Sequence, residues 1–334
     1  MLRYGMDDRR PQPSKREIKR LTVALAKSAY ERGIVRVASA DLRGHSHIVA
    51  SRQGLFAANR QSYRLIVYGL FFGLTLRDDA IYVFESCDIP AMPTRRGRVV
   101  RLHVRGQVIS DAAVLATGLD NGCHQIDFVD DRLCVLDTYN QRVLRFAPAG
   151  GGIETLDCLP RPKGREWASG YVHANSLLQV GGRILVLLHN GGKHTGRVSE
   201  AAVFDRAWRP LGRWMLPGYG CHDLVCLEDG DLLTCGSQAG ELISIGGTRI
   251  PISSMMTRGL SVGAAEVAVG ASRFSVRHER LFDGGTVTFL DRAMRIETVL
   301  ELPAAPTDIR RLDGQDFALS PYACDRARLP SLPF

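Results

Sequence analysis

Three histidines recur at one spacing along the chain. His124, His173 and His222 are separated by 49 residues in both intervals. Imidazole binds transition metals as a neutral ligand and titrates near neutral pH, so three convergent histidines suit metal-dependent chemistry, proton transfer or nucleophilic attack. The spacing predicts that the three occupy equivalent positions of a structural repeat and form an arc around one site.

The repeat itself reads as strand, tight turn, strand. The segments that contain the histidines begin at residues 122, 171 and 220, and weaker copies without the histidine begin at 73, 259 and 307. A repeat of roughly 40 to 50 residues with four short strands is typical of a β-propeller blade, because one such sheet cannot bury both faces alone. The sequence therefore predicts an all-β, six-bladed β-propeller, with five or seven blades as the nearest alternatives.

The two ends of the chain complete this architecture. Residues 46–334 are expected to form a single propeller domain, closed by pairing of N- and C-terminal strands, because the last unit is short and residues 47–69 supply extra strands. Residues 1–45 are expected to be a basic N-terminal arm with an amphipathic helix over 15–32. The helix signals are a capping box, a C-terminal glycine and an apolar row: Ser14 with Glu17, Gly33, and Ile18, Leu21, Leu25 and Ala29.

Residues 131–146 (Asp-Arg-Leu-Cys-Val-Leu-Asp-Thr-Tyr-Asn-Gln-Arg-Val-Leu-Arg-Phe) resemble an NHL repeat, with its Asp-Thr-x-Asn-x-Arg-Val pattern. The resemblance implies a propeller that serves either as an enzyme or as a binding platform. The fragments His173-Ala-Asn-Ser and His222-Asp are similar to motifs of the arylsulfate sulfotransferases, which implies histidines that face an axial channel.

Candidate substrate-binding residues are polar side chains near the channel end of a unit: Asn175, Asn190, Arg258, Arg273 and Asp308. Arg258 and Arg273 flank the inner strands of the fifth unit, where a guanidinium would bind an anionic substrate group. Asp308 aligns one place after the histidine position and would orient an imidazole or bind a cation. The glycine-rich segment with His189 and His194 is interpreted as a rim loop or lid.

These residues predict an enzyme that acts on a small, anionic molecule, dependent on histidine or on a divalent transition metal (Zn, Fe, Cu or Ni) held by His124, His173 and His222. No nucleotide cofactor is expected, because no dinucleotide fingerprint or P-loop is present. Two alternatives stay open. The histidines are inherited caps of strand turns, or the protein is a non-catalytic scaffold that holds a partner through its top face and its basic helix.

The positive charge of the chain is concentrated at its start. Residues 1–36 carry ten basic and four acidic side chains, whereas the whole chain has a formal net charge of +8. Contact with a polyanion or protein partner is therefore expected through residues 1–36. No transmembrane segment or secretory signal is found, and none of the eight cysteines forms a CxxC pair, so a cytoplasmic location is expected.

Overall fold

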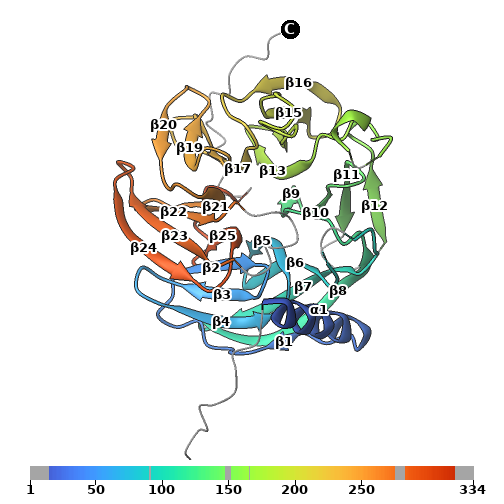
Figure 1. Ribbon diagram of the computed structural model, residues 1–334, viewed down its shortest axis with the longest axis vertical. Coiled ribbons are helices and arrows are strands. Elements are labelled where there is room, and N and C mark those ends of the chain that lie inside the picture. Colours follow the sequence, from blue (N-terminus) through green and yellow to red (C-terminus); the bar gives the residue numbers. More distant parts are fainter. Residues whose placement is uncertain (1–14, 90–91, 147–151, 165, 275–282, 320–334) are drawn as a thin grey trace, which may run out of the picture.

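Six β-sheets surround a central axis, which makes the protein a six-bladed β-propeller as predicted (Figure 1). The structure is a computed structural model that describes residues 15–89, 92–146, 152–164, 166–274 and 283–319. The innermost strands of neighbouring sheets contact one another around the axis.

Blades 1 to 5 each consist of four consecutive antiparallel strands, and the first strand of each is innermost. Their bounds are β5 (Phe71–Arg77), β6 (Ala80–Ser86), β7 (Gly97–Arg105) and β8 (Val108–Leu119) in blade 1; β9 (Ile126–Val129), β10 (Arg132–Asp137), β11 (Arg142–Phe146) and β12 (Ile153–Leu156) in blade 2; β13 (Ala174–Val180), β14 (Arg183–Leu188), β15 (Glu200–Asp205) and β16 (Pro210–Met215) in blade 3; β17 (His222–Cys226), β18 (Leu232–Gly236), β19 (Glu241–Ser244) and β20 (Arg249–Pro251) in blade 4; and β21 (Met256–Val262), β22 (Glu266–Ser272), β23 (Gly285–Asp291) and β24 (Ile296–Leu302) in blade 5.

Blade 6 joins the two ends of the propeller. Its innermost strand is β25 (Pro306–Arg311), and the strands outside it are β2 (His47–Ser51), β3 (Leu55–Ala58), β4 (Tyr63–Tyr68) and β1 (Arg36–Val37). β2 pairs antiparallel with β25, with Val49 opposite Ile309. A division at residue 45 cuts through this blade, because β1 pairs with β4.

Burial falls from the axis outward within each blade. Every residue of the inner strand β9 is buried, whereas the outer strand β12 is mostly exposed. The apolar core accordingly lies between blades: Val129 and Cys134 of blade 2 pack in one cluster with Leu177 and Val186 of blade 3. The second strand of a blade is covered on both faces, which explains why β14 is a continuous apolar run after Arg183.

Hydrogen bonds join the inner strands of neighbouring blades at all six junctions. Most inner strands contain a shift of register near the top of the propeller, the end at which they begin. Such bulges release backbone groups from the ladder, and side chains of adjacent blades bind several of them. The junction contacts, in order from the pair of blades 1 and 2, are Thr75 Oγ1 to Asp127 Oδ1, Leu177 N to Gln125 Oε1, Asp223 N to Ser176 Oγ, Gly259 N to Asp223 Oδ2, Arg310 Nη1 to Leu260 O, and Leu74 N to Asp308 Oδ2. We call this set the axial ring.

The helix α1 (Lys15–Glu31) confirms the predicted N-terminal helix, but within the predicted apolar row Ala29 is buried whereas Leu21 and Leu25 are not. Val23, Ala26 and Ala29 are buried, and Ala26 packs on Leu70. Leu21 and Leu25 are 54% and 43% exposed. Small alanines let the helix approach the propeller closely, so the helix rests on them rather than on the leucines. Ser14 lies outside the described residues. Within these, no helix is long and apolar enough to cross a membrane.

A buried arginine attaches the end of α1 to blade 1. Arg98 of β7 is 1% exposed and forms an ion pair with Glu85, with 2.7 Å between Nε and Oε2. Its Nη1 donates to the Ala29 carbonyl at 3.3 Å and its Nη2 to the Ile34 carbonyl at 2.9 Å. Arg98 therefore satisfies carbonyl groups at the helix C-terminus and neutralises a buried carboxylate at the same time.

Replacing Arg98 with leucine should lower the free energy of unfolding by about 3–5 kcal/mol, because the Glu85 carboxylate loses its partner in a buried place. The double variant Glu85→Leu/Arg98→Leu should recover much of that loss. Urea unfolding measures both changes. A double variant as unstable as Arg98→Leu would contradict this explanation.

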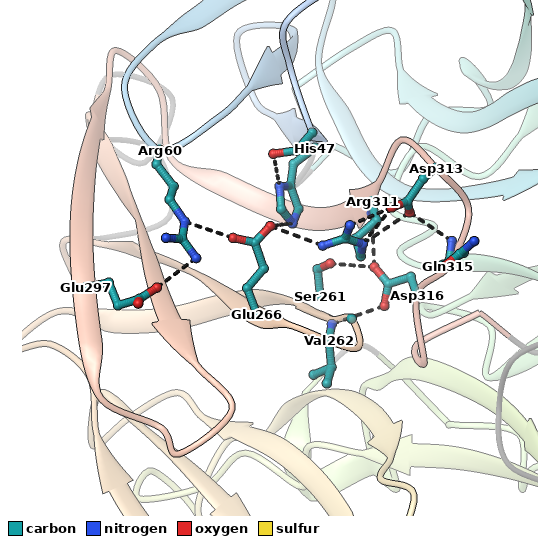
Figure 2. A network of polar contacts seen from close by, with 12 residues as sticks. His47, Arg60, Ser261, Val262, Glu266, Glu297, Arg311, Asp313, Gln315 and Asp316 are labelled. Carbon is teal, nitrogen blue, oxygen red and sulfur yellow. Dashed lines mark hydrogen bonds and ion pairs between the residues drawn. The ribbon is translucent and has the colours of Figure 1, made fainter.

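A second polar network joins blade 5 to blade 6 at the bottom of the propeller, the end at which the inner strands finish (Figure 2). Glu266 at the start of β22 accepts from Arg60 Nε at 3.0 Å and from Arg311 Nη1 at 3.1 Å. Asp316 accepts from Val262 N at 3.2 Å and from Arg311 N at 3.0 Å. These contacts fasten the blade that contains both ends of the propeller to its neighbour.

His47 lies within this network and is fully buried, with its Nε2 3.9 Å from Glu266 Oε1. Burial lowers the pKa of His47 from 6.5 to about 4, more than the Glu266, Asp313 and Asp316 carboxylates raise it. The unfolded chain therefore binds a proton at higher pH than the folded protein does. Stability that rests on the neutral imidazole is complete above pH 6.5 and is lost as the pH falls toward 4.

His47→Gln should flatten the pH dependence of unfolding between pH 6.5 and 4, removing at most about 3 kcal/mol of it. Denaturant unfolding at a series of pH values measures the slope. Other buried histidines contribute in the same direction, so the comparison is between variant and wild-type slopes. Equal slopes would show that His47 does not titrate as described.

Candidate functional site at the channel mouth

The structure brings His124, His173 and His222 together at the top of blades 2, 3 and 4. His222 is the first residue of β17, His173 directly precedes β13, and His124 lies two positions before the start of β9. The ring centroids of His124 and His173 are 4.7 Å apart, and those of His173 and His222 are 6.3 Å apart. Equivalent positions of three successive blades thus converge, as the repeat spacing predicts.

A fourth imidazole completes the group. His189 directly follows β14, and its backbone N–H donates to the His173 carbonyl at 3.2 Å. Its ring centroid is 5.2 Å from that of His173 and 5.2 Å from that of His222. Sequence analysis placed His189 in a rim loop and missed this role. Strand direction could have placed His189 beside His173, because the second strand of a hairpin ends where the first strand begins. We call these four residues the histidine cluster.

Backbone carbonyls fix the protonated nitrogen of two of the rings. Nδ1 of His124 is 2.8 Å from the Gly122 carbonyl, and Nδ1 of His222 is 3.1 Å from the Gly220 carbonyl. A carbonyl only accepts, so in each contact Nδ1 carries the proton. Nε2 of the neutral His124 and His222 rings is consequently the nitrogen with the lone pair.

The other two rings are fixed differently. The Gly191 N–H donates to Nδ1 of His189 at 3.1 Å, so in the neutral ring Nε2 carries the proton. The Tyr171 hydroxyl is 2.7 Å from Nδ1 of His173. His173 also has a φ of 53°, in the left-handed region that few residues other than glycine adopt. Such a backbone is costly, and the surrounding contacts hold it in place.

Burial disfavours the protonated form of two imidazoles of the cluster. Burial lowers the pKa of His173 well below its usual range, and the other three imidazoles lower it further. Burial also lowers the pKa of His222, followed in size by the effect of the Arg258 guanidinium. An imidazole that is neutral at pH 7 can bind a cation or accept a proton, but it cannot serve as an acid until its pKa rises.

Beneath the cluster lies a narrow polar cavity on the propeller axis. The space in which the centre of a water molecule fits is about 10 Å³, so the cavity holds one water molecule. His124 and His222 line it together with three of the predicted substrate-binding residues: Asn175, Arg258 and Asp308. The structure therefore places these three next to the histidine cluster.

The side chains of Asn175 and Asp308 already form hydrogen bonds with other groups of the protein. Asn175 Nδ2 donates to the Cys221 carbonyl at 2.9 Å. The Asp308 carboxylate accepts from Leu74 N and Ile309 N, both at 2.9 Å, and from Arg310 Nη1. Burial raises the pKa of Asp308 to about 7, against the lowering effect of Arg310. Asp308 thus holds backbone groups of the axial ring. The prediction from the sequence, that Asp308 orients an imidazole or binds a cation, stays a prediction.

Three predicted substrate-binding residues differ in their surroundings: Arg258, Asn190 and Arg273. Arg258 is 8% exposed and its guanidinium lies over the Phe72 ring, 5.9 Å from the centroid. Asn190 lies beside the cluster, directly after His189, and lines a separate pocket. Arg273 follows β22 at the same rim, is exposed, and does not line the axial cavity.

Across the residues that the structure describes, no group of three or more His, Cys, Asp or Glu side chains is arranged to hold a metal ion. Neighbouring imidazoles meet edge to face, at interplanar angles of 79° for His124 and His173 and 74° for His189 and His222. This is the geometry of packed rings. A metal would need the rings to turn so that their lone pairs converge.

No family model matches the sequence, and a search of curated proteins finds no match. Solved structures resemble it in fold. A nidogen/laminin complex has a TM-score of 0.57 at 9% identity, over 81% of this chain and 100% of that chain. A protein of unknown function from Bacteroides caccae has a TM-score of 0.53 at 10% identity, over 80% of this chain and 99% of that chain.

The structure titled streptogramin B lyase has a TM-score of 0.47 at 11% identity, over 82% of this chain and 95% of that chain. At 9–10% identity, the two matches with TM-scores of 0.57 and 0.53 show a shared fold and nothing about activity. The resemblance to NHL repeats is confirmed at the level of the six-bladed propeller. The resemblance to arylsulfate sulfotransferases finds no support in the comparisons.

Gly73 of β5 offers a test of how the cluster is positioned. A Cβ atom there would lie 2.4 Å from Gln125 Cα and 2.5 Å from the His124 carbonyl oxygen. Gly73→Ala should therefore push blade 1 away from blade 2 and cost about 1–3 kcal/mol of stability. NMR signals of the His124 ring should shift in the same variant. Gly106→Ala, where a Cβ meets nothing within 4 Å but φ is 55°, is a control for general strain. An unshifted His124 signal would contradict the prediction.

Proposed function

We propose that the protein is an enzyme whose histidine cluster acts on a small, anionic molecule at the mouth of the central channel. The observation that carries the proposal is the convergence of four imidazoles from three blades, with their Nδ1 atoms bound by protein groups. Repeat inheritance accounts for three equivalent histidines, but it does not account for His189, which comes from a different strand end.

In this proposal His124 and His222 accept a substrate proton at Nε2. Arg258 binds the acidic group of the substrate, because it is the guanidinium that lines the axial cavity. Its positive charge contributes to the low pKa of His222. An anion bound against Arg258 offsets that charge and raises the pKa of the nearby imidazoles, which readies them for proton transfer.

The test is turnover of a panel of small carboxylates, sulfate esters and phosphate esters by purified protein. His124→Ala and His222→Ala should each lower the rate on the accepted compound about 10²- to 10⁴-fold, the usual loss for a proton-transfer group. His45→Ala is the matched control, because His45 lines a different pocket, beside Asp313. Wild-type rates in both cluster variants, with unchanged circular dichroism, would refute the proposal.

A divalent transition metal (Zn, Fe, Cu or Ni) held by His124, His173 and His222 is the second form of the proposal. The observation in its favour is the proximity of the three rings, together with the lowered pKa of His173 and of His222, since metals bind deprotonated imidazole nitrogen. Elemental analysis of the purified wild type and of the three alanine variants measures it. Wild-type protein that is free of metal, and whose melting temperature does not change when each metal is added, would exclude this form.

A non-catalytic scaffold is the second candidate function, favoured by the exposed Leu21 and Leu25 of α1. They lie in the segment 1–36, whose ten basic and four acidic side chains suit an acidic partner. A scaffold predicts that Leu21→Ser/Leu25→Ser loses its captured partner in salt-dependent pull-downs. The enzyme predicts unchanged turnover in the same variant. Deletion of residues 1–36 is less informative, because Arg98 would lose its contacts with Ala29 and Ile34.

A further inference from the structure

A second, larger pocket opens beside the histidine cluster. Its volume is about 640 Å³, within the usual range for small-molecule sites. One wall is the 3₁₀ turn η1 (Trp167–Ser169) with Tyr171, and the opposite wall is the segment from Asn190 to Arg197. Glu166 and Arg197 are both exposed at its edge. The pocket has room for a molecule much larger than the axial cavity admits.

Two aromatic residues join this pocket to the cluster. Trp167 stacks on His189, with ring centroids 5.6 Å apart and an interplanar angle of 14°. Tyr171 binds Nδ1 of His173 through its hydroxyl, and its ring lies 5.2 Å from that of Trp167. Both residues also line the pocket, so a ligand held there touches the side chains that support His173 and His189.

Asn190 lies at the wall of this pocket and has a buried acceptor without a partner in the part of the chain that the structure describes. The residue is 1% exposed, and within the described residues its Oδ1 has no hydrogen-bond partner. Its Nδ2 donates to the Val198 carbonyl at 3.0 Å, which fixes the orientation of the amide. A buried acceptor without a donor is costly, and native proteins usually satisfy it.

We propose that this pocket binds a planar aromatic or heteroaromatic group that carries an N–H or O–H donor, with the ring against Trp167 and Tyr171 and the donor on Asn190 Oδ1. The inference rests on the proposed function, for which it specifies the substrate class. The group bound here is the recognised part of the substrate, and its acidic part is the one assigned to Arg258.

Indole-5-carboxylate and 1-methylindole-5-carboxylate are the probes, because they differ in the N–H donor. Isothermal titration calorimetry should show that the wild type binds indole-5-carboxylate with a submillimolar Kd, and that methylation weakens binding roughly tenfold. Trp167→Leu should weaken the binding of both probes, because the ring loses its stacking partner.

Asn190→Gly is the decisive variant, because φ at this residue is 57° and glycine tolerates it. The variant should bind the two probes equally, since the acceptor is gone. Asn190→Asp keeps an acceptor oxygen and should keep the preference. Asn140→Gly is the matched control, because Asn140 lines a different pocket; it should leave the preference unchanged.

Three results would overturn the proposal: no binding of indole-5-carboxylate below about 10 mM, equal binding of both probes by the wild type, or a preference that survives in Asn190→Gly. Equal binding by the wild type would mean that a water molecule alone satisfies Asn190 Oδ1. The proposed function fails separately, because its test is turnover. His124→Ala should keep probe binding while losing activity. Wild-type activity in both His124→Ala and His222→Ala would refute the catalytic role of the histidine cluster and leave the proposal for the pocket unaffected.

Discussion

Hydrogen bonds between neighbouring inner strands are the constraint on which the rest of the structure depends. Near the axis, six strands converge where little space remains for side chains, and their bulges release backbone groups that would otherwise be buried without partners. Short polar side chains of adjacent blades bind these groups, as Asp223 does for Gly259 and Asp308 for Leu74. The axial ring fixes the relative height of the blades, and so determines how the histidines meet above it.

Repetition made the fold predictable from the sequence. Six copies of one strand–turn–strand pattern require six similar sheets, and neighbouring sheets must cover each other's apolar faces. The orientation of α1 was not predictable in the same way. A helical pattern reveals apolar rows but does not reveal which row meets the body. That choice depends on contacts with Leu70 and Arg98, which are distant from the helix in the sequence.

Part of the candidate site was likewise predictable from the repeat, and part of it was not. His124, His173 and His222 could be grouped from spacing alone, because equivalent positions of successive blades must be neighbours. His189 belongs to no such series, and its place follows from strand pairing within blade 3. Asp308 was a candidate binding residue in the sequence, but its carboxylate accepts from the backbone N–H groups of Leu74 and Ile309. Bulge positions have no clear signal in a single sequence.

The order of strands in blade 6 has a consequence for synthesis. The innermost strand of this blade, β25, is the last strand described, whereas its other strands precede blade 1 in the chain. During translation, strands β2 to β4 are therefore synthesised before blade 1. They have no inner neighbour to pair with until all five other blades have been synthesised. The four residues of the histidine cluster all belong to blades 2 to 4, so they are synthesised before the ring closes. Closure comes afterwards, when Pro306–Arg311 leaves the ribosome and fills the remaining gap.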